Sequence, residues 1–213
     1  YKDNLANYQA LKATMLSKMF PKAGQTVPEI RLDGFEGEWE AKILSRVTNI
    51  TMGQSPKSEN YTDNPNDYIL VQGNADIKNK QVVPRLWTTE VTKMAEIGDI
   101  ILTVRAPVGD IGKTDYNVVI GRGVAAIKGN DFIFYTLEKM KMTGFWNRFS
   151  TGSTFDSISS NDIKEAIIQI PTLKEQQAIG AYFSNLDNLI NSYQEKISQL
   201  ETFKKKLLQD MFI

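Results

Sequence analysis

Five short segments combine small polar residues with isolated lysine or arginine side chains. They read MGQSPKSENY (52–61), QGNADIKNK (72–80), VRAPVGDIGK (104–113), GRG (121–123) and STGSTFDS (150–157). Side-chain amides and hydroxyls can donate to phosphate oxygens and read the edges of DNA bases, while single cations add attraction to the phosphate backbone. Ordinary hairpin turns have the same composition, so this pattern alone leaves both interpretations open.

Other kinds of chemistry find little support, because the sequence contains no histidine and no cysteine. Disulfides, thiolate nucleophiles and cysteine zinc sites are therefore excluded, as are the commonest general base and metal ligand. DNPNDY (63–68) resembles a methyltransferase loop but lacks its second proline, and GRGVAA (121–126) lacks the third glycine of a dinucleotide fingerprint. The scattered acidic residues show no metal-ligand spacing. We therefore expect no enzymatic activity, no cofactor and no metal.

The bulk composition is that of a globular protein with either one large domain or one domain and an appendage. The 213 residues carry 25 basic and 25 acidic side chains, so any nucleic-acid contact must come from local patches. No long apolar run and no leader segment occur, which predicts a cytoplasmic protein without membrane contact. The first residue, Tyr1, lies within a helical pattern, and both a natural chain of this length and a fragment of a longer one are open.

The two ends of the chain are copies of one element. When residues 1–21 are aligned with 193–213 without a gap, the identical pairs are Tyr1/Tyr193, Lys12/Lys204, Leu16/Leu208, Met19/Met211 and Phe20/Phe212. Asp3/Glu195, Leu5/Ile197 and Met15/Leu207 are chemically similar. Apolar residues recur at steps of three and four in both copies, which is typical of a helix.

The second copy ends a longer helical segment, which we predict over about 173–211. Pro171 ends the preceding element, and Thr172 with Glu175 forms a capping box. About 38 residues at about 1.5 Å each extend roughly 57 Å, longer than a domain of this size, which favours a projecting helix that pairs with another. The expected helix-pairing residues are Leu5, Tyr8, Met15 and Met19 in the first copy, and Ile179, Phe183, Leu186, Ile190, Tyr193, Ile197, Leu200, Leu207 and Met211 in the long segment.

The middle of the chain reads as an α+β domain with mostly antiparallel strands. Residues 21–39 form an irregular arm, and a helix is predicted at 131–142, begun by Asn130 or Asp131 and ended by Gly144. The spacing of the predicted strands is too irregular for βαβ units. These strands are 68–72, 81–84, 99–104, 117–121, 123–128 and 166–171.

Several blocks together resemble the specificity subunit of type I restriction–modification enzymes. The blocks are VPEIRLDGFEGEWEAKIL (27–44), GDIILTVRAPVGDIGK (98–113), GRGVAAIK (121–128), STGSTFDSISSNDIKEAIIQIPTLKEQQAIGAYFSNLD (150–187) and KKKLLQDMF (204–212). The succession of GSTF, IP and EQQ and the GFEGEW arm are the most specific parts, and the resemblance covers essentially the whole chain.

The resemblance implies a DNA-recognition role without catalysis. In that family a full subunit has two target-recognition domains, each reading half of a split DNA site and each followed by a conserved helix. The two helices pair antiparallel, while methylation and cleavage belong to other subunits. This chain is then half a subunit: a helix at 1–20, an arm at 21–39, one recognition domain at 40–171 and a coiled-coil helix at 172–213.

The same resemblance predicts the partners. The short helix should lie antiparallel along about 175–195, leaving the stripe of Ile197, Leu200, Leu207 and Met211 without a partner in the chain. We expect this stripe to form a homodimer, tail against tail. Methyltransferase subunits, and through them restriction subunits, are expected to dock on the helices. Outward polar positions for that docking are predicted at Glu175, Gln176, Asn185, Asp187 and Asn188.

The expected partner of the loops is double-stranded DNA, with lysines on phosphates and Arg105 or Gln54 on base edges. Arg105 could instead brace its turn by pairing with Asp99 or Asp110. Phe155, Ile158 and the three tryptophans are predicted to be packing residues. An alternative function is a decoy that binds methyltransferase subunits and reads no DNA. The predicted DNA-binding residues are Gln54, Ser55, Lys57, Asn74, Lys78, Lys80, Arg105, Lys113, Arg122, Thr151, Ser153 and Thr154.

Overall fold

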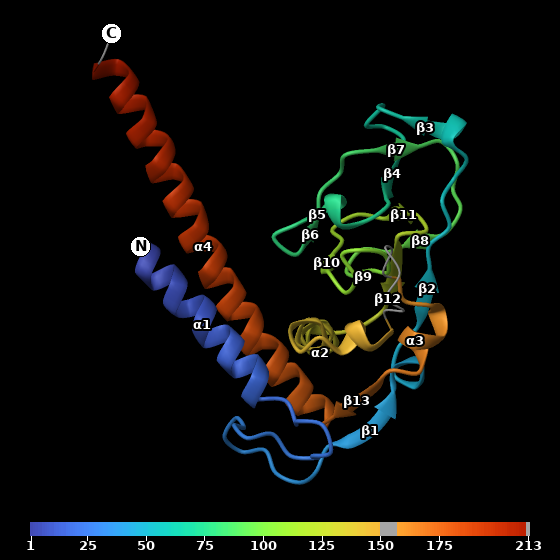
Figure 1. Ribbon diagram of the computed structural model, residues 1–213, viewed down its shortest axis with the longest axis vertical. Helices are drawn as coiled ribbons and strands as arrows, with labels where there is room; N and C mark the ends of the chain where they lie inside the picture. The colour runs from blue at the N-terminus through green and yellow to red at the C-terminus, as the bar shows by residue number, and fades with distance from the viewer. Residues whose placement is uncertain (150–156, 212–213) are drawn as a thin grey trace.

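Two helices from opposite ends of the chain lie side by side and project from the rest of the protein (Figure 1). The computed structural model describes residues 1–149 and 157–211. Helix α1 spans Lys2–Lys18 and helix α4 spans Leu173–Met211. The predicted bounds of the long helix are confirmed. The two run antiparallel, as predicted, because Lys12 pairs with Asp187 and Lys2 pairs with Glu201, beyond the expected limit at 195.

Burial decreases along α4 from its first turns to its last. The helix begins where the Thr172 hydroxyl accepts from the backbone N–H of Glu175, which is one half of the predicted capping box, while the Glu175 carboxylate binds Arg31 instead of closing the box. Its apolar stripe is then buried against α1 and the globular part, half-buried in the middle and exposed near the end. The buried members are Ile179, Phe183, Leu186 and Ile190, the half-buried ones Tyr193 and Ile197, and the exposed ones Leu200, Leu207 and Met211.

Two sheets form the globular part, and most of their strand pairs are antiparallel. The six-stranded sheet has the order β2 (Ile50–Met52), β12 (Val124–Ile127), β9 (Ile100–Thr103), β10 (Ile111–Lys113), β6 (Gln81–Val82) and β5 (Ile77–Lys78). The five-stranded sheet has the order β3 (Tyr61–Thr62), β7 (Trp87–Thr88), β4 (Tyr68–Val71), β11 (Val118–Ile120) and β8 (Met94–Ala95). Among the described strands, only β10 with β6 and β11 with β4 run parallel.

Strands β9 and β12 are buried on both faces, which explains their nearly continuous apolar sequences. Successive side chains of a strand point to opposite faces. Ile100 and Leu102 therefore join the apolar cluster that contains helix α2 (Asp131–Met142), whereas Ile101 joins the cluster between the two sheets. Helix α2 begins as predicted, because the Asn130 side chain accepts from the N–H of Ile133. The core thus lies in two layers, one on each side of the six-stranded sheet.

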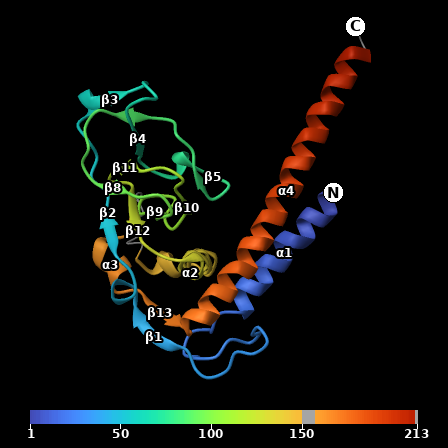
Figure 2. The ribbon, with the colours of Figure 1, turned by 180° about the vertical axis from the view of Figure 1, so that it is seen from behind.

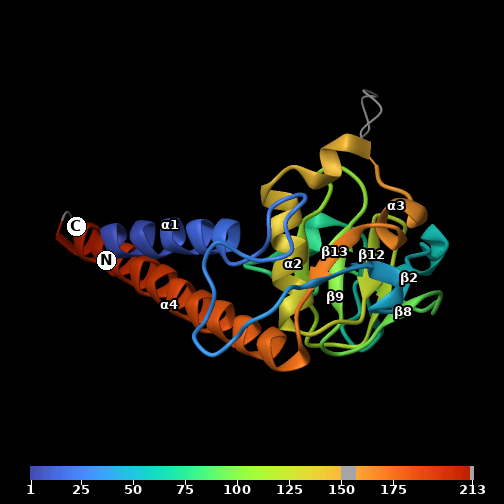
Figure 3. The same cartoon turned by 90° about the horizontal axis from the view of Figure 1, so that it is seen from below.

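A two-stranded ribbon brings the chain into and out of the globular part at one place. Strand β1 (Glu40–Ile43) pairs antiparallel with β13 (Ile167–Ile170), and α4 begins directly after β13 (Figure 2). Seen from below, α1 and α4 extend to one side, away from the sheets (Figure 3). The remaining short elements are α3 (Ser160–Lys164) and the 3-10 turns η1 (Leu44–Arg46), η2 (Ser58–Asn60), η3 (Asn74–Asp76) and η4 (Phe145–Phe149).

The α+β class with mostly antiparallel strands is confirmed, and each of the six predicted strands is present. Strands β1, β2, β3, β5, β7, β8 and β10 were not predicted. Each has two to four residues, too few for an alternating pattern to stand out. Among the described residues, no helix is both long and apolar enough to cross a membrane.

Candidate nucleic-acid interface

Four of the predicted DNA-binding residues lie around one surface hollow of about 260 Å³. Ser55, Asn74, Arg105 and Arg122 come from four different loops, and each lines this hollow. Tyr61 and Gln72 also line it. The loops follow β2, β4, β9 and β11, so the two sheets together bring the four side chains to one place.

Close backbone packing holds three of these loops together. A Cβ atom on Gly53 would lie 2.0 Å from the carbonyl oxygen of Gly121, and one on Gly123 would lie 2.0 Å from that of Gln72. Only glycine permits such an approach. The N–H of Arg122 also donates to the Ser55 hydroxyl at 3.1 Å. Gly53 and Gly123 are therefore required by loop packing, and a Cβ on Gly121 would lie 3.2 Å from the Gln72 side chain, which explains the glycines of the GRG segment without a nucleotide site.

Arg105 is exposed at the start of a braced loop. The Thr103 hydroxyl donates to the carbonyl of Pro107 at 2.6 Å and accepts from the N–H of Asp110 at 2.8 Å. Asp99 accepts from the N–H of Glu96, and Asp110 pairs with Lys141. Within 1–149 and 157–211, neither carboxylate forms an ion pair with Arg105, so the bracing alternative lacks support there.

Arg85 lies beside this site and was missed by the sequence reasoning. A second hollow of about 650 Å³ shares Gln72 and Asn74 with the first and adds Arg85. The Arg85 guanidinium donates to the carbonyl of Ala75 at 2.8 Å and lies 3.7 Å from Asp76. Asp76 in turn accepts from the N–H of Gln72 at 2.7 Å. In the sequence, the only sign of Arg85 was that it is a single basic residue between the short strands β6 and β7.

Three further predicted residues are exposed on neighbouring segments. Gln54 presents its side chain to solvent while its carbonyl accepts from the Thr92 hydroxyl at 2.5 Å. The N–H of Lys57 donates to Glu90 at 2.8 Å, and this bond, with a second from Asn60, holds the pKa of Glu90 below its usual value. Lys78 is exposed on β5.

Lys80 and Lys113 are engaged inside the protein. Asn79 and Lys80 have positive φ angles of 50° and 62°, which turn the β5–β6 hairpin toward the helices. Lys80 Nζ then lies 2.6 Å from Glu138 and 3.1 Å from Asp187. Lys113 pairs with Asp131 at the start of α2. We therefore leave both lysines out of the interface considered below.

The remaining predicted loop falls outside the described residues. Thr151, Ser153, Thr154 and Phe155 belong to 150–156 and stay predictions. Next to them, Ile158 is buried, as expected of a packing residue. Trp39 and Trp146 are also buried, and Trp87 is half-buried.

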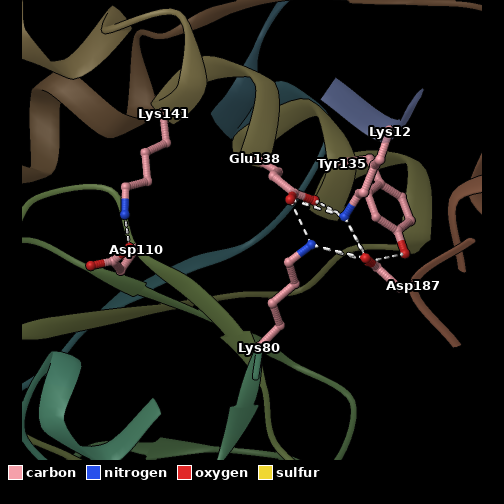
Figure 4. Close-up of polar contacts among 7 residues, drawn as sticks. All are labelled: Lys12, Lys80, Asp110, Tyr135, Glu138, Lys141 and Asp187. Atoms are coloured by element: carbon pink, nitrogen blue, oxygen red, sulfur yellow. Dashed lines mark hydrogen bonds and ion pairs between the residues drawn. The ribbon is translucent and has the colours of Figure 1, made fainter. Parts of the chain in front are cut away.

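A cluster of opposite charges joins α1, α2, α4 and the β5–β6 hairpin (Figure 4). Lys12 lies 2.8 Å from Glu138 and 2.6 Å from Asp187, and Lys80 contacts the same two carboxylates. The Tyr135 hydroxyl donates to Asp187 at 2.9 Å. Burial raises the pKa of Tyr135, and the charge of Asp187 raises it further, so the phenol stays protonated. We call these five residues the lysine–carboxylate cluster.

Two residues that we predicted to face outward on α4 are in fact engaged within the chain. Asp187 belongs to the lysine–carboxylate cluster. Glu175 is 1% exposed and accepts two hydrogen bonds from Arg31, both at 2.8 Å. Neither can serve as a free docking position, and the prediction was wrong for both. Gln176 is half-buried and is also engaged, because it accepts from the Asn130 side chain at 2.9 Å and donates to the carbonyl of Pro171 at 3.0 Å. Asn185 and Asn188 are exposed, as predicted.

Comparisons with known proteins agree on one family. The family model described as "Type I restriction modification DNA specificity domain" matches residues 36–202. The putative type I restriction enzyme MjaX specificity subunit of Methanocaldococcus jannaschii is 31% identical over 208 residues, which covers 92% of this chain and 48% of the relative. The MjaIX specificity subunit of the same organism is 24% identical over 193 residues, 83% of this chain and 44% of the relative.

Solved structures give the same result. The HsdS subunit from Thermoanaerobacter tengcongensis has a TM-score of 0.71 and 28% identity, covering 92% of this chain and 47% of that one. A chain from a structure on complex assembly and conformational transition of the type I R-M system has a TM-score of 0.77 and 28% identity, covering 97% of this chain and 50% of that one. This chain therefore spans about half the length of the relatives it matches.

Proposed function

The chain belongs to the type I restriction modification DNA specificity family, and from this premise we propose that it reads one half of a bipartite DNA target. The observation that carries the proposal is the convergence of Ser55, Asn74, Arg105 and Arg122 on one hollow. Asn74, Arg105 and Arg122 are exposed together on loops from two sheets, and the half-buried Ser55 hydroxyl lies beside them. Such a set can contact both phosphates and base edges.

The proposed interface assigns different contacts to different side chains. Arg105 and Arg122 suit a guanine edge or a phosphate, because the guanidinium offers paired donors. Lys57, on a separate exposed loop, suits a phosphate. The members of the proposed interface within the described residues are Gln54, Ser55, Lys57, Asn74, Lys78, Arg85, Arg105 and Arg122.

In this proposal the chain supplies recognition, and partner subunits supply the chemistry. A methyltransferase subunit would bind the helices and act on a base taken out of the duplex. The exposed Leu200, Leu207 and Met211 support pairing with a second copy, which would place two recognition domains about a two-fold axis. The DNA target would then be a palindrome in two halves with a fixed gap.

Selection from random DNA tests the proposal. The chain is purified with its methyltransferase subunit, bound duplexes are sequenced, and the preferred motif is measured again for Arg105→Ala. We expect the variant to lose about 1–3 kcal/mol of discrimination at one base pair. Arg46→Ala is the matched control, because Arg46 is exposed but lines neither hollow. A complex that assembles but selects no motif would contradict DNA reading and favour the decoy function.

The salt dependence of binding separates phosphate contacts from base contacts. Lys57→Ala should weaken binding to every duplex about equally and should reduce the slope of log K against log salt by about 1. Arg105→Ala should instead weaken the preferred motif most. If Lys57→Ala changed the preferred motif and left the slope unchanged, Lys57 would be a base contact and our assignment would be wrong.

A further inference from the structure

Residues that are buried in and directly after α1 occur again, in the same order, in the last turns of α4. Five positions of the first repeat are buried; Pro21 differs from its counterpart Ile213, and the other four, with exposed fractions of 5% or less, are identical in the second repeat. The counterparts are exposed where the structure describes their burial, with Leu208 at 46% and Met211 at 74%. These four buried residues are Lys12, Leu16, Met19 and Phe20, and their counterparts are Lys204, Leu208, Met211 and Phe212.

The surface that receives α1 is built for this set. Lys12 lies between Glu138 and Asp187. Leu16, Met19 and Phe20 join the core, where the Phe20 ring lies 5.4 Å from Phe132 and 6.0 Å from both Trp39 and Phe183. An acidic pair beside an aromatic pocket therefore recognises a lysine followed by apolar residues four, seven and eight positions later. We call Trp39, Phe132, Glu138, Phe183 and Asp187 the α1 site.

We propose that the α1 site of one copy accepts the C-terminal turns of α4 from a second copy, in exchange for its own α1. The inference rests on the homodimer of the proposed function and specifies its contacts. Lys204 of the second copy takes the position of Lys12 between the two carboxylates. Leu208 and Met211 of the second copy take the positions of Leu16 and Met19.

The register of α1 on α4 makes this exchange symmetric. The Tyr8 ring lies 5.4 Å from that of Tyr193, and Leu200 is the counterpart of Tyr8, so Leu200 of the second copy lies opposite Tyr193. The Tyr1 ring lies 6.0 Å from Tyr193, and Tyr1 is itself the counterpart of Tyr193. These contacts place a two-fold axis near Tyr193 and Ile197. The two α4 helices then run antiparallel and use the same face in both copies, as a closed dimer requires.

Exchange changes few contacts. Each site loses one lysine and one apolar set and regains their counterparts, which is why swapping of equivalent elements is a low-cost route to dimers. Leu208 and Met211 of the second copy are buried at the same time, but Leu16, Met19 and Phe20 next to the displaced α1 become exposed, so the buried apolar area stays about the same. Each α1 belongs to the same chain as the site that it occupies, which gives it a high effective concentration there. This covalent connection opposes exchange. The dimer therefore depends on protein concentration.

Neighbouring residues of the tail provide matched variants of the full chain. Lys204 and Lys206 are both exposed, but Lys206 is the counterpart of the exposed Thr14. Leu207 and Leu208 are both 46% exposed, but Leu207 is the counterpart of the half-buried Met15 and Leu208 that of the buried Leu16. Because all four side chains are exposed in the single chain, their replacement leaves its fold intact, which an unfolding curve verifies.

Sedimentation velocity over a range of concentrations measures the dimer constant. We expect Lys204→Glu and Leu208→Ala to weaken dimerisation by roughly tenfold or more, because each loses buried contacts worth at least 1.4 kcal/mol. Lys206→Glu should stay within about twofold of the parent. Amide hydrogen exchange gives a second readout: in the dimer, residues 2–18 should lose protection and residues 200–211 should gain it.

The outcomes separate this inference from the homodimer itself. A dimer that tolerates Lys204→Glu and Leu208→Ala, is weakened by Leu207→Ala and keeps α1 protected would overturn the exchange and leave a simple tail-against-tail pair. A chain that stays monomeric at every concentration would overturn both. If Lys206→Glu weakened dimerisation as much as Lys204→Glu, the effect would be one of charge in general. That result would also overturn the exchange.

Discussion

Lys12 on α1 donates to both carboxylate oxygens of Asp187 on α4, at 2.6 and 2.8 Å, although 175 residues separate the two in sequence. Glu138 on α2 accepts from the same ammonium group. The two terminal helices and the globular part are therefore joined at one buried point.

Removal of the lysine should destabilise the whole chain. In Lys12→Ala, Glu138 and Asp187 keep only Lys80 as a cationic partner, and breaking one partner of a buried ion pair costs about 3–5 kcal/mol. We expect the free energy of unfolding to fall by about 3 kcal/mol, measured by urea denaturation with tryptophan fluorescence. Lys2→Ala removes the exposed pair with Glu201 and should have no measurable effect. Equal stability of the two variants would contradict the role of the cluster.

The stability contributed by Asp187 should depend on pH. Burial raises the pKa of Asp187, but Lys80 and Lys12 outweigh burial and hold the pKa below its ordinary value of 3.8. A carboxyl with a depressed pKa stabilises the fold above the unfolded-state pKa, and this contribution is lost as the pH falls through the folded-state pKa. The stability difference between the parent and Asp187→Asn should therefore be largest near neutral pH and should shrink below about pH 4.

Urea denaturation of the parent and Asp187→Asn across the acid range provides the measurement. Asp63→Asn is the control, because Asp63 is exposed on a loop. A difference between the parent and Asp187→Asn that stayed constant from neutral to strongly acid pH would contradict a depressed pKa. It would mean that the asparagine variant loses packing and hydrogen bonds alone.

The bounds of α2 and α4 were predictable from sequence because local signals determine them, whereas the five-residue helix α3 was not predicted. The apolar stripe of α4 and its cap at Thr172 lie within a few residues of each other, as do Asn130 and the first turn of α2. Strands β3, β7 and β8 were missed because two-residue strands depend on neighbours far along the chain.

The candidate site also contains residues whose positions follow from local sequence and residues whose positions depend on distant partners. Polar loop composition grouped Ser55, Asn74, Arg105 and Arg122 with other candidates, and the structure places these four around one hollow. It also included Lys80, whose carboxylate partners lie 58 and 107 residues away and leave no local trace. Glu175 was read as solvent-facing for the same reason, because its partner Arg31 is 144 residues away.

A methyl group at Gly123 should disrupt the hollow. The Cβ atom of Gly123→Ala would lie 2.0 Å from the backbone oxygen of Gln72, so the loop after β11 or the loop after β4 must move. We expect a loss of about 1–3 kcal/mol in stability together with weaker DNA binding. Gly73→Ala is the matched control in the same hollow, because its Cβ meets no atom within 4 Å. Urea denaturation and a binding titration measure the two effects, and equal behaviour of the variants would contradict the close-packing explanation.

Arg31 joins the arm at 21–39 to α4 by hydrogen bonds, beside the apolar packing of Trp39. Arg31 donates twice to Glu175, at 2.8 Å each, and also to the carbonyls of Gly37 at 2.6 Å and Glu36 at 2.9 Å. Lysine keeps the charge but cannot span these acceptors, because its ammonium is a compact point charge. Arg31→Lys should therefore cost about 2 kcal/mol of stability.

Limited proteolysis should detect the freed arm. In Arg31→Lys we expect faster cleavage within 32–38, because the arm opens locally more often when its carbonyls lose their donors. Lys22→Ala is the control on the same arm, since Lys22 makes only an exposed pair with Glu29. If Arg31→Lys and the parent were cleaved at the same rate, the arm would be held by packing of Trp39 and Phe20 instead. The angle between α4 and the sheets would then not depend on the buried Arg31–Glu175 pair.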